Sequence, residues 1–216
     1  MKFNCTCVLA SSLLVIAFSA SSSSFQDETN PSTATGPSAM HKHSDEGKGD
    51  NLLKLPDHFT PYASESIGDG KRCIVGVTTD DDGLNQRPVA YVAGSEIKRA
   101  IWIAPLDPPP NTFQSRATHC NHHGAALFVL LQSDTQPEQT LSQTLLRVVK
   151  LDAATGAVQA QRNVAVPKAH TAWVDEGASH FRWQGNVLTI SGNYRRQSDQ
   201  DDQTPFTVHL THDLNP

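Results

Sequence analysis

The sequence predicts an all-β domain, and three observations lead to this expectation. Apolar residues gather in short runs rich in Val, Ile, Leu and aromatic residues, as they do in strands buried on at least one face. Turn signals separate these runs, among them Gly156 and the segment Gln184-Gly185-Asn186. Apolar residues do not recur at helical spacing for more than two turns. We therefore expect an antiparallel β-meander or β-sandwich of short hairpins.

The first residues of the chain predict an export signal. Lys2 is followed by an apolar run over residues 13–18, and small residues come next. This run is shorter than the roughly 20 apolar residues that a membrane-spanning helix needs, and small residues suit signal peptidase. Cys5 and Cys7 precede the apolar run, which argues against a lipid-bearing cysteine. We expect a signal peptide over residues 1–20, with an uncleaved anchor as the alternative.

Residues 21–70 are expected to form a disordered tail rich in Ser, Pro, Gly and His. Such a composition cannot bury enough apolar surface to offset the conformational entropy lost on ordering. One amphipathic stretch, residues 52–56, is expected to dock on the folded part, and Pro56 and Pro61 then keep the chain extended. Residues 71–216 have the length of a single β domain.

Within this domain the apolar runs predict strands that follow one another at short intervals. The expected strands cover residues 73–78, 88–92, 100–104, 113–118, 125–131, 145–151, 158–164, 180–183, 187–194 and 206–210. The turn after residue 151 ends in Gly156, which can adopt a positive φ, and Gly185 does the same between two of the strands. These turns indicate tight hairpins.

A faint internal repeat suggests an alternative arrangement of the strands. Residues 124–152 align with residues 185–210, each unit holding two strands joined by a polar loop, and residues 91–107 form a shorter copy. The Leu-Asp-x-x-Thr-Gly pattern at residues 151–156 resembles the outer strands of β-propeller blades. A closed propeller needs at least four blades of four strands, which is more than this domain provides. Partial, propeller-like blades are therefore the alternative fold.

Charge and hydropathy exclude two classes of partner. The formal net charge is −5 at pH 7 with both signs scattered, so the sequence has no basic stripe to attract nucleic acid or anionic lipid. After the signal, no stretch approaches the length of a membrane span. We expect a periplasmic or secreted protein with no nucleic-acid partner and no membrane insertion. The mature sequence lacks an Asn-x-Ser/Thr acceptor, which favours a bacterial envelope.

Two cysteines, Cys73 and Cys120, remain once the signal is removed. An exported chain with an even number of cysteines usually pairs them, so we expect one disulfide. In the chain-entropy model, a loop of this length contributes on the order of 3 to 4 kcal/mol. Two free thiols, or thiolate ligands for a metal, are the alternative.

Three imidazoles, those of His119, His122 and His123, lie close together in the sequence beside Cys120. Neutral imidazole is the commonest protein ligand for zinc and copper, so a copper or zinc site is one interpretation. Pairing of Cys120 with Cys73 would remove the thiolate, and neighbouring histidines of a strand point to opposite faces. The spacing also matches no familiar ligand pattern. The alternative is a polar turn beside the disulfide, with no cofactor.

The sequence carries no recognisable catalytic motif. A Ser-x-x-Lys pattern at residues 95–98 lacks its usual partner motifs, and the acidic segments 80–83 and 199–202 lack the alternation of a calcium loop. His170, near Asp175 and Glu176, is the remaining candidate for a general base. We therefore expect a protein that is not an enzyme, with a hydrolase lacking a known motif as an alternative.

Large side chains and long loops favour a binding function. Trp173, Arg182, Trp183 and Tyr194 are of the types that anchor interfaces, and they are the predicted binding surface. The polar loops over residues 132–142 and 195–203 are long for hairpins, and long loops on a rigid scaffold often bind ligands. We expect an exported binding protein that recognises or neutralises another protein of the bacterial envelope, as an inhibitor or immunity protein does.

Overall fold

The computed structural model describes residues 52–95, 98–135 and 142–216. The predicted signal peptide and residues 21–51 of the predicted tail lie outside the described residues. Two residues of the Ser-x-x-Lys pattern, 96 and 97, also lie outside them. The described residues form three antiparallel sheets and one short 3-10 helix, η1 (Ala178–His180). The all-β expectation is therefore confirmed.

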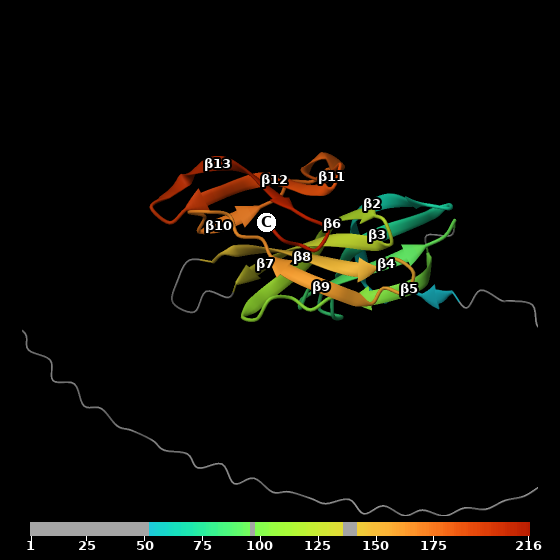
Figure 1. The fold of residues 1–216 in the computed structure, drawn as a ribbon. Coiled ribbons are helices and arrows are strands. Elements are labelled where there is room, and N and C mark those ends of the chain that lie inside the picture. Colours follow the sequence, from blue (N-terminus) through green and yellow to red (C-terminus); the bar gives the residue numbers. More distant parts are fainter. Residues whose placement is uncertain (1–51, 96–97, 136–141) are drawn as a thin grey trace, which may run out of the picture. The chain divides into compact units, whose positions relative to one another are not determined.

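Each sheet is built from strands that follow one another in the chain (Figure 1). Sheet A contains β1 (Leu53–Lys54), β2 (Phe59–Gly68), β3 (Lys71–Thr78), β4 (Arg87–Ala93) and β5 (Arg99–Pro105), in the order β1-β5-β4-β3-β2. Sheet B contains β6 (Thr112–His123), β7 (Ala126–Thr135), β8 (Thr144–Asp152) and β9 (Val158–Asn163), in that order. Sheet C contains β10 (Thr171–Trp173), β11 (Phe181–Gln184), β12 (Val187–Arg196) and β13 (Asp199–Leu210). In this sheet β10 and β11 pair with successive parts of β12, which also pairs with β13.

Every strand predicted between residues 71 and 216 is present, but the folded part begins before residue 71. Strand β2 lies inside the segment predicted as a tail, and it pairs with β3 along most of its length. The boundary is therefore corrected to include residues 53–68. The physical reason is that alternate residues of β2 face the rest of the protein, so Ala63 and Ile67 pack on the core despite polar neighbours. The polar composition of this segment is the reason that the sequence did not predict a half-buried strand here.

The stretch predicted to dock, residues 52–56, does contact the folded part. Strand β1 pairs with β5 at one edge of sheet A, whereas β2 lies at the other edge, so the residues between them cross a face of the sheet. Leu55 and Phe59 pack there against Tyr91 and its buried neighbours. Gly76 permits the close approach of the start of β2 to β3, because a Cβ atom at this position would clash with the Thr60 carbonyl oxygen.

Sheet B is the middle layer of the fold. One of its faces packs on sheet A through one apolar cluster, and the other packs on sheet C through a second cluster. Alternate residues of β7 enter the two clusters: Leu127, Val129 and Leu131 belong to the first, whereas Phe128 and Leu130 belong to the second. This explains why the first eight residues of β7 are buried without interruption, since a strand covered on both faces needs no polar side.

Sheet C differs from sheet B in that only its inner face packs against another sheet. Along β13, Phe206 and Val208 pack towards sheet B while the residues between and beside them are more exposed. Thr207 and His209 alternate with them along the strand. This one-sided burial gives β13 the alternating pattern of a half-buried strand.

The three sheets of short antiparallel strands, packed face to face, confirm the predicted class of β-meander or β-sandwich. Three such sheets are present in the described residues, and a closed propeller needs at least four. The Asp152–Gly156 turn docks sheet B on sheet A: Trp102 donates its indole N–H to the Ala153 carbonyl at 3.1 Å. Gly156 has the predicted positive φ, of 76°, and lies directly against the Trp102 ring.

Candidate functional site

A pocket of about 480 Å³ opens where the three sheets come together. Its walls come from β2 of sheet A, from β6 and β7 of sheet B, and from the segment of sheet C that runs from β10 through η1 to β11. The lining residues are Tyr62, Ala63, Ser64, Glu65, Arg116, Thr118, His119, Cys120, Gln132, Trp173, Val174, Glu176, Gly177, Ala178 and Phe181. Pockets of a few hundred Å³ with mixed apolar and polar walls are typical of ligand sites.

The predicted disulfide lies at the wall of this pocket. Cys73 on β3 and Cys120 on β6 form a disulfide, so a covalent bond joins sheet A to sheet B. Both cysteines belong to the apolar cluster between these sheets. The expectation of a Cys73–Cys120 pair is confirmed, and the bond fixes two walls of the pocket relative to each other.

The histidine-rich segment beside Cys120 is a strand, not the loop or turn that the sequence suggested. It forms the end of β6, where a bulge near Thr118 shifts the pairing with β7. The bulge lets Ala117 and Cys120 face the same way, towards sheet A, although three positions separate them. As a result His119 and His123 face sheet C, where they contact Phe181 and Trp183, with His123 stacked at 4.2 Å.

The buried amide of Gln132 ties β7 to the chain that follows β10. Its Nε2 donates to the Val174 carbonyl at 2.9 Å and to the Thr118 hydroxyl at 3.1 Å. Its Oε1 accepts the Val174 N–H at 3.0 Å, so the amide pairs with one residue as a neighbouring strand would. Gln132 is 7% exposed, and these bonds satisfy both ends of its amide.

His119 extends the same network on the other side of Thr118. Its Nε2 lies 3.0 Å from the Asp175 carbonyl oxygen, which can only accept, so Nε2 carries the proton. In the neutral ring Nδ1 then accepts from the Thr118 hydroxyl, at 3.0 Å. Burial lowers the pKa of His119 below its usual value of 6.5, although the hydrogen bond to the Asp175 carbonyl opposes this shift. The imidazole is therefore neutral, with both nitrogens engaged inside the protein.

The charged groups of the pocket differ in their partners. Arg116 donates from Nη2 to the Asp134 carboxylate at 2.9 Å, so its charge is already balanced. Glu65 on β2 is half-buried and Glu176 after β10 is exposed. Across the described parts of the chain, neither glutamate forms a hydrogen bond or ion pair. The pocket thus presents two unpaired carboxylates.

The structure does not bring the three predicted metal ligands together. His119 and His123 face sheet C, whereas His122, the neighbour of His123 on the strand, faces the other way. Within residues 52–95, 98–135 and 142–216, no group of three or more His, Cys, Asp or Glu side chains could hold a metal ion. A copper or zinc site therefore has no geometric support in this part of the chain.

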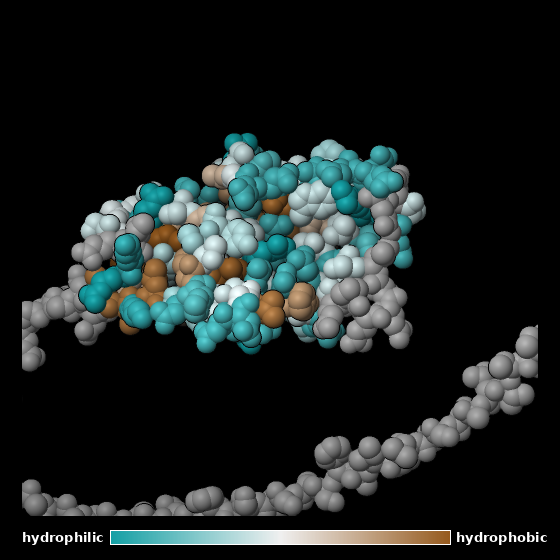
Figure 2. All heavy atoms as spheres, turned by 180° about the vertical axis from the view of Figure 1, so that it is seen from behind, coloured by the Kyte–Doolittle hydropathy of each residue, from teal (hydrophilic) through white to brown (hydrophobic). Residues whose placement is uncertain are grey.

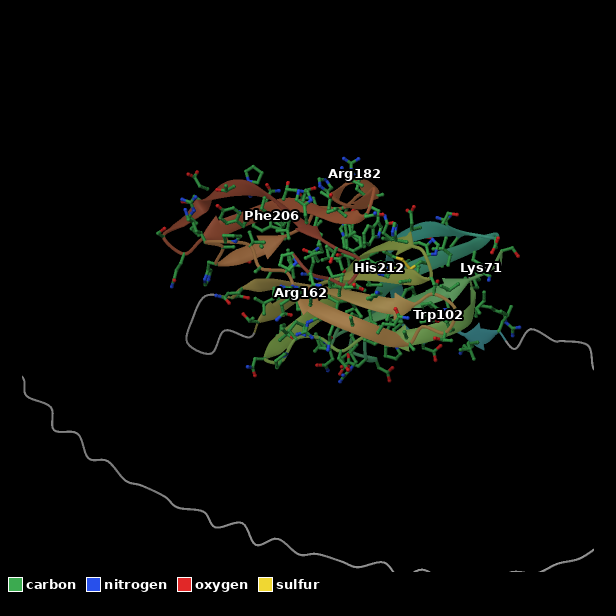
Figure 3. The ribbon with its side chains drawn as sticks, in the orientation of Figure 1. Lys71, Trp102, Arg162, Arg182, Phe206 and His212 are labelled. Atoms are coloured by element: carbon green, nitrogen blue, oxygen red, sulfur yellow. A yellow bond between two sulfur atoms is a disulfide. The ribbon has the colours of Figure 1, made fainter. Side chains whose placement is uncertain are left out.

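The four residues of the predicted binding surface do not form one patch. Trp173 lines the pocket, with the Arg195 guanidinium 5.3 Å from its ring centroid. Tyr194 and Trp183 point into the core between sheets B and C. Arg182 is exposed on the side of sheet C turned away from sheet B, whereas His212 lies between these sheets (Figure 3). Trp173 is thus the one member that reaches the pocket.

The two long polar loops also differ from their prediction. Strand β7 continues to Thr135, and strands β12 and β13 pair as far as Arg196 and Asp199, which leaves a two-residue turn in place of a long loop. The residues that do line the pocket, notably Glu65, Arg116 and Gln132, had no local signal, because each lies among other polar residues of a strand. Only pairing of distant strands brings them together.

Outside the pocket, the face of the protein in Figure 2 carries small hydrophobic patches separated by hydrophilic residues. No helix in the described residues is long and apolar enough to cross a membrane. A comparison with known proteins finds no protein family, no curated protein and no solved structure that matches this chain. The function must therefore be argued from the site itself.

Proposed function

We propose that the chain is an exported, non-catalytic binding protein, and that a segment of another protein of the bacterial envelope occupies the pocket between the three sheets. The pocket itself carries this proposal. It has the volume of a ligand site, and residues of all three sheets contribute to its walls. The covalent bond at Cys120 and the buried amide of Gln132 hold these walls in place, which favours binding without a large ordering cost.

Binding fits the chemistry of the pocket better than catalysis does. Its imidazole, His119, uses both ring nitrogens within the protein, so it has no free nitrogen to take a proton from a substrate. The other candidate base, His170, lies outside the pocket lining, and its Nδ1 is 3.0 Å from the Gln143 amide. The polar groups that remain available, Glu65 and Glu176, are suited to recognising a ligand.

The test is native mass spectrometry of the untagged protein, purified gently from its own compartment. We expect a second polypeptide to accompany the wild-type chain. The Ala178→Trp substitution fills the pocket from the exposed side of η1 and should release that polypeptide. The matched control, Ala154→Trp in the exposed β8–β9 turn, should retain it.

Two results would contradict the proposal. Equal retention of the polypeptide by both tryptophan variants would place the binding site elsewhere on the protein. A chain that appears alone with one bound copper or zinc ion would favour the metal-binding alternative instead.

A further inference from the structure

We propose that the pocket recognises a cationic group, the ammonium or guanidinium side chain of a basic segment in the partner protein. This inference rests on the proposed function, since it names the chemistry of the ligand in the same pocket. Three features of the described residues carry it: the balance of charges, the aromatic walls and the fixed position of the acidic groups.

The balance of charges in the pocket is negative. Among the lining residues, Glu65 and Glu176 are acidic and Arg116 is the cation. Asp134 neutralises Arg116 at 2.9 Å, which leaves the two glutamates without a counterion in the described residues. An anionic ligand would meet two carboxylates and a guanidinium already engaged. A cationic ligand would supply a partner that these glutamates lack.

Aromatic side chains complete the walls around these carboxylates. Tyr62 is 39% exposed at the pocket, Trp173 is half-buried there, and Phe181 lies behind them, fully buried. The faces of aromatic rings attract cations, and because Arg195 already lies over Trp173 at 5.3 Å, Tyr62 is the ring that a cationic ligand would contact. The methylene groups of a lysine or arginine side chain would also pack well against such walls.

The two glutamates come from different sheets, and their separation is set by the core. Glu65 lies on β2 between Ala63 and Ile67, which both pack on the cluster between sheets A and B. Glu176 follows Val174, whose backbone is held by Gln132. The backbone beside each glutamate is therefore held in place before a cation binds, which favours selective binding.

The experiment uses peptides that differ only in charge. Isothermal titration calorimetry on the full-length mature protein compares acetyl-Gly-Arg-Gly-amide with the same peptide carrying neutral citrulline, and with a Glu peptide. We expect the Arg peptide to bind roughly tenfold more tightly than the citrulline peptide, with affinity falling as salt is raised. Glu65→Gln and Glu176→Gln should each weaken Arg binding by several-fold to about tenfold.

The control is Asp202→Asn, which removes an exposed carboxylate outside the pocket lining and should leave binding unchanged. A thermal melt of each variant checks that folding is intact. If the citrulline or Glu peptide binds as tightly as the Arg peptide, the cationic preference is wrong while the pocket remains a binding site. If no peptide binds, the inference also fails. The proposed function is then tested separately by native mass spectrometry, which shows whether the Ala178→Trp variant still carries the second polypeptide.

Discussion

The two interfaces of sheet B are held together in different ways. Towards sheet A the contact is mainly apolar and covalent: the Cys73–Cys120 bond lies in a hydrophobic cluster, and Trp102 lies against Gly156 and donates one hydrogen bond to Ala153. Towards sheet C a hydrophobic cluster is joined by buried hydrogen bonds from Gln132 and His119. Apolar burial depends mainly on the area removed from water, whereas a hydrogen bond also requires a particular donor–acceptor geometry.

This difference matters for the pocket, which borders both interfaces. The disulfide sets the position of sheet A against β6, and the hydrogen-bond network sets the segment after β10 against β7. Changes at the interface with sheet A should therefore lower the free energy of unfolding most. Changes at the interface with sheet C should alter the shape of the pocket and the pH dependence of the protein's stability. The following experiments test this contrast in order of expected effect.

The largest effect is expected from removing the disulfide. The bond closes a loop with a sequence separation of 47 residues. The chain-entropy model then predicts that the Cys73→Ala/Cys120→Ala double variant loses about 4 kcal/mol of unfolding free energy. Urea denaturation with and without reductant provides the measurement. If reductant destabilises the double variant as much as the wild type, the effect does not come from this bond.

The Gly156→Ala substitution tests the contact between the β8–β9 turn and sheet A. Its Cβ would lie 2.5 Å from the Trp102 ring, at a φ of 76° that disfavours side chains. We expect a loss of about 3 kcal/mol from strain and displaced packing together. Gly83→Ala is the matched control, because its φ of 74° is similar while its Cβ would meet nothing within 4 Å. If both variants lose the same free energy of unfolding, the Trp102 ring moves aside for the new Cβ atom without a measurable loss of stability.

The Gln132→Leu substitution tests the interface with sheet C. It keeps the side-chain volume similar but leaves the N–H and C=O of buried Val174 without partners, so we expect a loss of about 2 kcal/mol. Gln161→Leu on the exposed strand β9 should change stability by less than about 0.5 kcal/mol. Chemical denaturation measures both variants. Amide hydrogen exchange should also quicken at Val174, and unchanged protection there would contradict the assigned role of Gln132.

The smallest effect is a dependence of stability on pH that arises from His119. Because the folded pKa of His119 lies below 6.5, the unfolded chain takes up a proton before the folded chain does as the pH falls. The free energy of unfolding should therefore decrease from about pH 6.5 down to the folded pKa, and this contribution should be constant above pH 6.5. Thermal melts across this range should show a weaker dependence for His119→Gln, while His122→Gln should behave as the wild type.

The local pattern of apolar and turn residues predicted the strands well, but it did not predict the residues of the pocket. Short apolar runs identified ten strands, and cysteine number and export context identified the disulfide. Strands β1, β2 and β10 escaped detection, since they are short or rich in polar residues. The histidines near Cys120 drew attention as metal ligands, but the alternation of a strand separates His122 from His119 and His123. The predicted loops at residues 132–142 and 195–203 were partly strands.

Local residue patterns were enough to predict the all-β class, the positions of most strands, the turn at Gly156 and the pairing of Cys73 with Cys120. These features depend on neighbouring residues or on a single pair of side chains, so local chemistry suffices. The packing of the sheets was needed to show that sheet B is a middle layer and that Glu65, Gln132 and Glu176 line one pocket. Such groupings depend on how strands distant in the chain are packed, and hydrophobic burial fixes that packing without leaving a pattern in any one segment.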